Sequence, residues 1–176
     1  CNASCILAAK ILGRQPSGTI PHAAILIAGD TVTVAKAYDE IMPPDSPRII
    51  LVDTFKDEAE EALNVAEALK GALEGVRLDT PSERGGVTKE LVNEVRQRLN
   101  QKGYNNVKIF VSGGLTPDKI RELSEAGADA FGVGSYISGA SPIDMTMDIK
   151  MVDGVPVAKR GRIPGLIENP KLKRVK

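Results

Sequence analysis

Short apolar runs alternate with longer amphipathic stretches along most of the chain, and this alternation restricts the possible folds more than any other feature. The apolar runs are predicted strands at residues 23–28, 48–55, 75–80, 107–112 and 129–135. From the second run onward, the stretches between them carry apolar residues three or four positions apart, as in an amphipathic helix. Strands joined by helices lie parallel, because a parallel pair needs a long crossover connection. The sequence therefore predicts an α/β fold.

Two architectures accommodate parallel strands with helical crossovers: a (β/α) barrel and an open doubly wound sheet. The five predicted strands are too few for a barrel of eight. The fold is therefore predicted to be an incomplete (β/α) barrel, or one completed by residues outside this chain. Further helices are predicted over residues 6–13 and from Asp30 and Thr31 to about Met42, and a strand hairpin at residues 153–154.

Residues 1–176 are expected to form one part of a barrel domain, with the hairpin and a polar tail after about residue 145. The opening residues, CNASCILAAKILG, read as a helix from the middle of a domain, and no Met precedes them. We expect the chain to be the C-terminal portion of a longer protein, without its N-terminal substrate domain.

Charge is balanced, with 23 basic and 23 acidic residues. No basic patch with interleaved aromatic residues suggests nucleic acid as a partner, and no apolar run is long enough to span a membrane. Cys1 and Cys5 are the two cysteines, and no second Cys pair or His cluster completes a metal site with them. Free thiols are the expected state, as in a cytoplasmic protein.

Glycines close two successive strands of the predicted sheet. The first edge comprises Ser112, Gly113 and Gly114, and the second comprises Gly132, Gly134 and Ser135. Backbone N–H groups approach a phosphate closely only where no side chain intervenes, and a following helix adds partial positive charge. Barrels often bind phosphate at the loops after two consecutive late strands. The pattern favours a phosphate site, and the alternative is that these glycines only make tight turns.

Charged side chains are predicted to share the same edge of the sheet. Arg77 and Asp79 lie two positions apart on one strand, so both point to the same side. The arginine suits a phosphate or pyrophosphate and the aspartate suits ribose hydroxyls or Mg²⁺, although a structural ion pair fits equally well. Asp53 ends a buried strand, where it serves the site or caps the next helix. His22, the chain's one histidine, lies in a turn before the first predicted strand and faces this edge.

Five motifs follow one another in order: GTIPHA, LVDTF, RLDTPSERGG, SGGL and GVGSYIS. Together they resemble the C-terminal barrel region of nicotinate phosphoribosyltransferase, a type II phosphoribosyltransferase, especially its shorter archaeal-type forms. The similarity extends over nearly the whole chain. It implies transfer of a phosphoribosyl group from phosphoribosyl pyrophosphate to nicotinate, giving nicotinate mononucleotide for NAD synthesis. It also implies an incomplete α/β barrel, Mg²⁺ beside the pyrophosphate, and dimers whose active sites use residues from both subunits.

The resemblance also implies roles for the residues that contact the donor. The two glycine edges, residues 112–114 and 132–135, would hold its 5′-phosphate. Arg77 would face the donor's phosphates, with Arg84 as a further phosphate contact, and Asp79 would face the ribose hydroxyls.

Asp53 would lie near the ribose or the metal, whose ligands the resemblance leaves open. His22 matches a histidine that many members phosphorylate when ATP hydrolysis is coupled to turnover. Because the family's N-terminal domain is absent from this sequence, the isolated chain is expected to be inactive and to need a complementary polypeptide.

Three alternatives stay open. Quinolinate phosphoribosyltransferase has the same barrel and glycine cradle but takes a dicarboxylate and releases CO₂, whereas the histidine turn and RLDTP favour nicotinate. An aldolase or isomerase barrel would need a catalytic lysine, and neither Lys108 nor Lys150 has a clear acid/base partner. The third is a fragment that only binds phosphorylated ligands or a partner chain.

Overall fold

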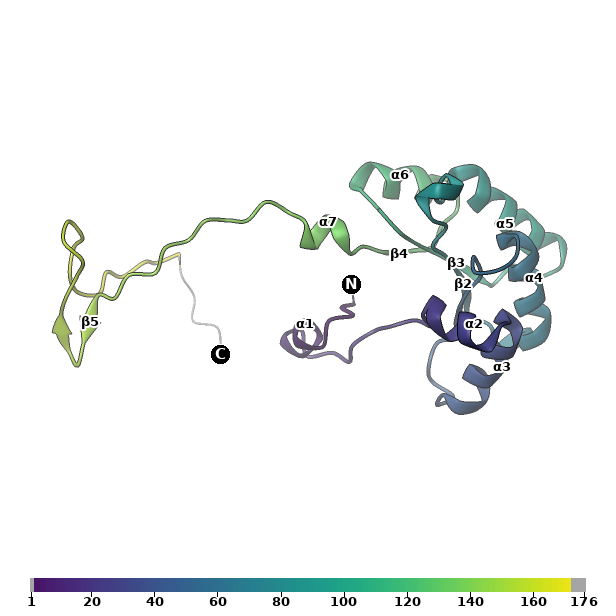
Figure 1. Cartoon of the computed structure of the whole chain (residues 1–176), viewed down its shortest axis with the longest axis horizontal. Coiled ribbons are helices and arrows are strands. Elements are labelled where there is room, and N and C mark those ends of the chain that lie inside the picture. Colours follow the sequence, from purple (N-terminus) through teal and green to yellow (C-terminus); the bar gives the residue numbers. More distant parts are fainter. Residues whose placement is uncertain (1, 172–176) are drawn as a thin grey trace. The chain divides into compact units, whose positions relative to one another are not determined.

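The computed structural model of the protein describes residues 2–171 (Figure 1). The chain divides into two compact units, Cys1–Gly139 and Ala140–Lys176. No helix within residues 2–171 is long and apolar enough to cross a lipid bilayer. Cys5 is exposed and its thiol is free, whereas Cys1, the other half of that pair, lies outside the described residues.

A parallel sheet forms the centre of the first unit. Its strands are β1 (Ile49–Leu51), β2 (Gly75–Leu78), β3 (Lys108–Ser112) and β4 (Ala130–Gly132). They lie in the order β1-β2-β3-β4, which follows the sequence without a reversal. A doubly wound sheet reverses its strand order, whereas successive strands of a barrel are neighbours. The α/β class is therefore confirmed, the strand order is that of a barrel segment, and closure into a barrel stays a prediction.

Helices connect the strands and pack in the same order as the strands do. The connecting helices are α4 (Glu58–Leu69), α5 (Lys89–Gln101) and α6 (Pro117–Glu125), and α3 (Thr31–Ile41) precedes β1. Helix α3 packs on α4, α4 on α5, and α5 on α6 (Figure 1). Short 3-10 turns, Lys70–Ala72 and Ser82–Arg84, lie in the connections on either side of β2.

Side chains cap the starts of α3 and α6. The Asp30 carboxylate accepts a hydrogen bond from the backbone N–H of Thr33 at 2.7 Å, and α3 starts at the next residue. Thr116 caps α6 in the same way, and Pro117 takes the first helical position. Gly127, with a φ of +98°, follows the last turn of α6. The predicted start of α3 at Asp30 and Thr31 is confirmed.

The core lies between the sheet and these helices. Ile50, Val76 and Ile109 pair across β1, β2 and β3 in register, and all three are fully buried. On the helices, residues such as Val65 and Leu99 are equally buried. Burial of strands and helices against one another accounts for the near-continuous apolar runs of the strands.

The predicted strand at residues 23–28 is a helix, α2 (His22–Ala28). Only Ile25 of this segment is fully buried, and Gly29 ends the helix with a φ of +77°. A short apolar run fits a buried strand and a helix equally well, because its periodicity is not resolved over six or seven residues. The parallel sheet consequently has four strands rather than the five expected. Helix α1 (Ile6–Ile11) precedes α2, and a helix was predicted there.

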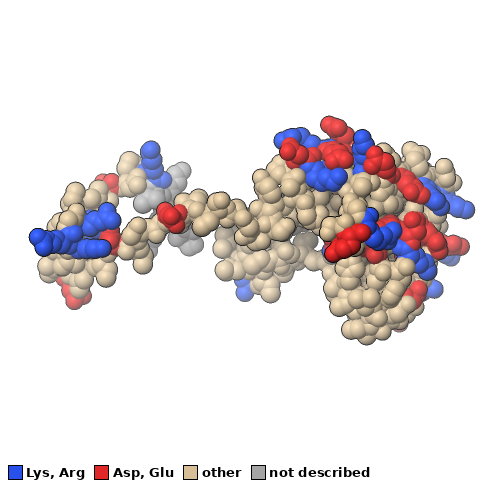
Figure 2. All heavy atoms as spheres, turned by 45° about the horizontal axis from the view of Figure 1, so that its top comes forward, with Lys and Arg blue, Asp and Glu red and all other residues tan. Residues whose placement is uncertain are grey.

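Positive and negative side chains are interspersed on the face of the first unit shown in Figure 2. In the first unit, some opposite charges pair within a single helix, as Arg98 does with Glu94 on α5 at 2.9 Å and Arg121 does with Asp118 on α6 at 2.6 Å. This arrangement agrees with the balanced composition of the sequence, since no patch of one sign dominates that face.

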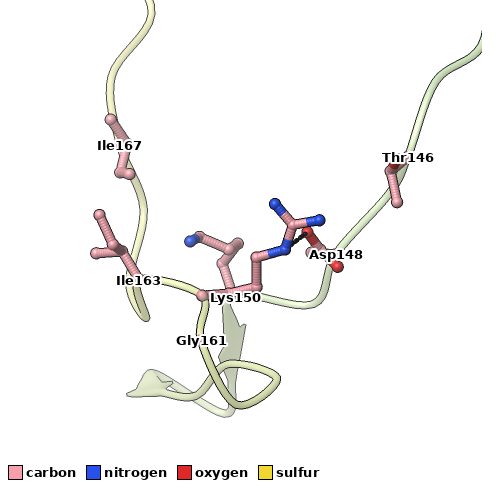
Figure 3. A pocket seen from close by; sticks show the side chains of 7 residues that line it. Thr146, Asp148, Lys150, Gly161, Ile163 and Ile167 are labelled. Atoms are coloured by element: carbon pink, nitrogen blue, oxygen red, sulfur yellow. Dashed lines mark ion pairs between the residues drawn. The ribbon is translucent and has the colours of Figure 1, made fainter.

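The second unit contains the predicted hairpin. Strands β5 (Met151–Val152) and β6 (Val155–Pro156) are antiparallel and are joined by Asp153 and Gly154. A shallow pocket of about 460 Å³ lies beside the hairpin, where Arg162 forms an ion pair with Asp148 at 3.4 Å (Figure 3). Helix α7 (Ser135–Ser138) belongs to the end of the first unit.

Candidate functional site

Arg77 is the centre of a hydrogen-bonded group at the carboxyl ends of the strands. Its Nε donates to Ser112 Oγ at 2.8 Å, and its Nη2 donates to Asp79 Oδ2 at 2.6 Å. Its Nη1 donates to Thr19 Oγ1, in the segment before α2. An arginine has five N–H donors, so one N–H on each terminal nitrogen stays available for a ligand. We call the edge of the sheet around Arg77 the rim.

Asp79 and Arg77 point to the same side, as their spacing predicts. Both side chains are about one-fifth exposed, so a ligand can reach the pair from solvent although most of each side chain is buried. The structural ion pair proposed as the alternative is present. The pair does not exclude a ligand, because Asp79 retains lone pairs and Arg77 retains donors.

Gly113 allows the Asp79 carboxylate to approach the end of β3. A Cβ atom at Gly113 would lie 2.8 Å from Asp79 Oδ1, and the residue has a φ of +90°. Gly114 follows with a φ of +59°. Only glycine adopts this conformation at this proximity without strain. These two glycines thus make a tight turn, and the same turn leaves backbone groups uncovered next to Asp79.

The second glycine edge is less closely tied to Arg77. Gly132 pairs with Ser112 in the sheet, and a Cβ atom at Gly132 would lie 3.2 Å from that of Ser112. Gly134 and Ser135 lie at the start of α7. Within the described residues, no hydrogen bond joins the Ser135 side chain to the Arg77 group. The structure therefore brings Gly132 next to the first edge, whereas Ser135 lies three residues further along the chain, at the start of α7.

His22 and Asp53 form a second pair. His22 Nε2 lies 3.1 Å from Asp53 Oδ2, with the Asp53 side chain fully buried and the imidazole 39% exposed. Burial raises the pKa of the Asp53 carboxyl, and the hydrogen bond with His22 opposes that rise. The negative charge of Asp79 also raises the Asp53 pKa, so the two aspartates are within electrostatic range.

Two expectations for this pair need correction. His22 is the first residue of α2 and does not lie in a turn before a strand, because residues 23–28 are helical. Asp53 does not cap the next helix, since Asp57 accepts the hydrogen bonds from Ala59 and Glu60 at the start of α4. Asp53 Oδ1 is a buried oxygen without a hydrogen-bond partner among the described residues. An unpaired buried oxygen is costly, so it marks a position where a ligand would find an acceptor.

Arg84 lies against a residue that the sequence interpretation missed. Its Nη2 donates to Glu58 Oε2 at 3.3 Å, and Thr80 Oγ1 donates to Glu58 Oε1 at 2.9 Å. A signal for Glu58 was present in α4, because Glu58 precedes Ala62, Val65 and Leu69 at helical spacing and so belongs to the buried stripe. A carboxylate on the apolar face of a helix predicts a buried partner.

A metal ion would need ligands beyond those of the protein. Within residues 2–171, no group of three or more His, Cys, Asp or Glu side chains is arranged to hold one. Mg²⁺ in phosphate-binding sites usually takes one or two carboxylates, with phosphate oxygens and waters as its other ligands. Asp53 and Asp79 meet that requirement, since Asp53 Oδ1 has no hydrogen-bond partner in the described structure and Asp79 lies on the rim.

An apolar groove of about 500 Å³ lies between the segment before α2 and helix α3. Thr19, which accepts a hydrogen bond from Arg77, is among its lining residues, together with Pro21, and Tyr38 and Ile41 line it from α3. No charged side chain lines the groove, so it does not offer a cation to a carboxylate ligand.

A family model and several relatives match this chain. The model described as "Quinolinate phosphoribosyl transferase, C-terminal domain" matches residues 8–148. A nicotinate phosphoribosyltransferase of Mycobacterium tuberculosis is 30% identical over an alignment of 166 positions, gaps included, and the alignment covers 88% of this chain and 35% of the relative. The nicotinate phosphoribosyltransferase of Bacillus subtilis is 26% identical over an alignment of 184 positions, gaps included, and the alignment covers 97% of this chain and 36% of the relative.

A solved structure is also similar, the crystal structure of nicotinate-nucleotide pyrophosphorylase from Pyrococcus furiosus. It is 48% identical in sequence with a TM-score of 0.77, and the match covers 94% of this chain and 42% of that chain. This chain thus spans about a third of the length of the curated relatives it matches, and less than half of the solved chain.

Proposed function

The chain belongs to the family of quinolinate phosphoribosyl transferase C-terminal domains, and we propose that it supplies the donor-binding part of an enzyme that makes nicotinate mononucleotide. The reaction would transfer the phosphoribosyl group of phosphoribosyl pyrophosphate to nicotinate and release pyrophosphate. The observation that carries the proposal is the Arg77 group, because it gathers a cation, a carboxylate and a side-chain-free backbone turn at one edge of the sheet.

Names of relatives favour nicotinate as the acceptor. The Mycobacterium tuberculosis and Bacillus subtilis relatives are named nicotinate phosphoribosyltransferases. The Pyrococcus furiosus protein is named for nicotinate nucleotide, which is the product from either acceptor, so its name favours neither. The name of the family model favours quinolinate, which is the second candidate. Both acceptors are pyridine carboxylates and use the same donor, so the donor site is common to the two proposals.

The donor would lie across the rim with its two phosphate ends apart. The turns at residues 112–114 and 132–135 would hold the 5′-phosphate through backbone N–H groups. Arg77 would direct its two available N–H groups at the pyrophosphate, with Arg84 as a further contact. Asp79 would accept hydrogen bonds from the ribose hydroxyls.

Positioning and charge would account for most of the catalysis. Breaking the anomeric C–O bond gives an oxocarbenium-like centre and an anionic leaving group, and the pyridine nitrogen attacks with its own lone pair. The protein's task is to hold both ends of the donor and to stabilise the developing charges. Asp53 and Asp79 would hold Mg²⁺ together with pyrophosphate oxygens, and the ion would supply positive charge to the leaving group.

His22 is proposed as the group through which ATP hydrolysis could be coupled to turnover. Its imidazole is 39% exposed and its Nε2 is engaged by Asp53, so Nδ1 is the nitrogen left for another partner. Incubation with γ-labelled ATP would show whether His22 accepts a phosphate, with His22→Gln as the control.

Recognition of the acceptor's carboxylate is proposed to need a complementary polypeptide. The apolar groove beside Thr19 has no charged lining residue, and the chain spans only about a third of its curated relatives. Isolated, the chain is expected to bind the donor but to form no product. Completed by such a polypeptide, it is expected to form a homo-oligomer, with each site using residues from two subunits.

Two measurements test the proposal. Calorimetry of the isolated chain with phosphoribosyl pyrophosphate tests the donor site, and absence of binding contradicts it. Titration of the completed protein with nicotinate and with quinolinate tests the acceptor: nicotinate should yield mononucleotide, and reaction of quinolinate alone, with release of CO₂, would decide for the second candidate. Mononucleotide formation by the isolated chain would contradict the need for a complementary polypeptide.

A further inference from the structure

Glu58 is a buried acid in the first turn of α4, and both of its carboxylate oxygens are used. Its exposed fraction is 1%, and its oxygens accept hydrogen bonds from Thr80 at 2.9 Å and from Arg84 at 3.3 Å. A buried carboxylate is stable only where hydrogen bonds or a cation replace water. The two donors are therefore the partners that allow Glu58 to be buried.

The two donors come from the two ends of one loop. Thr80 directly follows Asp79, which is paired with Arg77 on the rim. Arg84 ends the 3-10 turn Ser82–Arg84. Glu58 therefore ties helix α4 both to the end of β2 and to the loop beyond it.

The backbone of this loop is held by its own hydrogen bonds. The N–H groups of Arg84 and Gly86 both donate to the carbonyl of Pro81 at 3.0 Å. Gly85 and Gly86 have φ values of +93° and +70°, which turn the chain back toward α5. These bonds fix the Cα atom of Arg84, but they do not fix the direction of its long side chain. Glu58 is what fixes that direction.

Arg84 keeps most of its hydrogen-bonding capacity. Its side chain is 54% exposed, and among the described residues its guanidinium makes one hydrogen bond, the ion pair with Glu58. Four of its five N–H donors are left, and a guanidinium held by one edge can still grip an anion with the other. An exposed arginine without such an anchor would lose rotamer freedom on binding a ligand, and that loss weakens binding.

We infer that Glu58 is a positioning residue, which holds the Arg84 guanidinium beside the end of β2 in readiness for the donor's pyrophosphate. Glu58 does not touch the ligand in this arrangement and acts only through Arg84. The inference rests on the proposed function, because it takes the pyrophosphate as the anion that Arg84 meets. It adds a residue to the site that neither the motifs nor the relatives' names assign.

A double-mutant cycle tests the inference with inorganic pyrophosphate and ribose 5-phosphate as separate probes. Glu58→Gln keeps the size of the side chain and an acceptor for Thr80, but it removes the charge that holds Arg84. Calorimetry should show pyrophosphate binding weakened about fivefold to tenfold, and ribose 5-phosphate binding changed less than about twofold. In an Arg84→Gln background, adding Glu58→Gln should change neither probe, since the residue it acts through is already gone.

Glu60→Gln is the matched control, because Glu60 is an exposed acid of the same helical turn. It should leave binding of both probes unchanged, which excludes a general effect of lost negative charge. If Glu58→Gln does not fold, Glu58→Asp replaces it, since the shorter acid keeps its charge but withdraws from Arg84. Melting temperatures of all variants report whether the fold is intact.

Three outcomes contradict the inference. Equal weakening of both probes by Glu58→Gln would show a structural role only. A full effect of Glu58→Gln in the Arg84→Gln background would show that it does not act through Arg84. Unchanged pyrophosphate binding in Arg84→Gln would remove Arg84 from the site. If the unaltered chain binds neither probe, the proposed function itself fails, and that result is distinct from the other three.

Discussion

The carboxylate of Asp79 occupies the space that a side chain at Gly113 would need. Asp79 Oδ1 lies 2.8 Å from the position of a Cβ atom on Gly113, and Gly113 has a φ of +90°. Two demands therefore coincide at one residue: a backbone conformation that side chains rarely allow, and close approach of an acid from the neighbouring strand. The rim depends on both, because Asp79 is also the partner of Arg77.

Gly113→Ala is expected to destabilise the protein by about 1–3 kcal/mol and to weaken binding of ribose 5-phosphate. Strain at φ +90° and the displaced Asp79 carboxylate both contribute to the loss. Urea denaturation gives the free energy of unfolding, and calorimetry gives the affinity. Gly71→Ala is the control, since a Cβ atom there meets nothing within 4 Å. A Gly113→Ala variant as stable as the parent chain would contradict the geometry of the turn.

Arg77→Lys is expected to weaken binding of phosphoribosyl pyrophosphate at least about tenfold although the charge is retained. A lysine ammonium can replace the ion pair with Asp79, but it does not span Asp79, Ser112 and Thr19 at once as the guanidinium does. Calorimetry with the donor measures the loss. Arg98→Lys, in an exposed pair with Glu94, is the control and should bind like the parent chain. Equal affinities for the two variants would show that charge alone matters at position 77.

Much of the rim could be predicted from local rules. Alternation of side chains along a strand placed Arg77 and Asp79 on one side, and the structure joins them at 2.6 Å. Ser112 follows from the parallel arrangement, because neighbouring strands end at the same edge. Capping rules located the start of α3 at Asp30. Each of these inferences needs only near neighbours in the sequence or adjacent strands.

The features that were missed depend on contacts between distant segments. Helix α2 was expected to be a strand, since its apolar run has no resolvable period and only the packing of the first unit decides its conformation. Glu58 is one of three acids in the first turn of α4, where acids are common because they favour the helix dipole. Helical spacing places Glu58 on the buried stripe of α4, but its partners Thr80 and Arg84 belong to the loop after β2, and nothing near Glu58 in the sequence identifies them.

Ile109→Ala is expected to lower the free energy of unfolding by about 2–5 kcal/mol. Ile109 is fully buried at the centre of the sheet, where it pairs in register with Val76, so truncation leaves a cavity. Urea denaturation measures the change. Ile27→Ala is the matched control, since that side chain is 87% exposed on α2, and its effect should stay within about 0.5 kcal/mol. A small effect at Ile109 would contradict the position of β3 within the core.

Stability should depend on pH through Asp53. Its pKa is raised from the ordinary value of 3.8, chiefly because burial disfavours the charged carboxylate. At pH values above 3.8, the Asp53 carboxyl therefore holds its proton more tightly in the folded protein than in the unfolded chain. A folded state that binds more protons loses stability as the pH rises. Asp53 therefore lowers the free energy of unfolding as the pH rises from 3.8 to its raised pKa in the folded protein.

Asp53→Asn removes that titration while keeping a similar shape and a hydrogen-bonding partner for His22. Relative to the parent chain, its free energy of unfolding should increase as the pH rises through this window and should level off above it. Urea denaturation at a series of pH values measures the difference, and subtracting the two curves cancels the other acids. His22→Gln gives a second reading, because loss of the histidine's opposing effect should move the carboxyl titration of Asp53, followed by ¹³C NMR, to higher pH. A difference that falls with pH, or a titration that moves lower in His22→Gln, would contradict the buried pairing of these two residues.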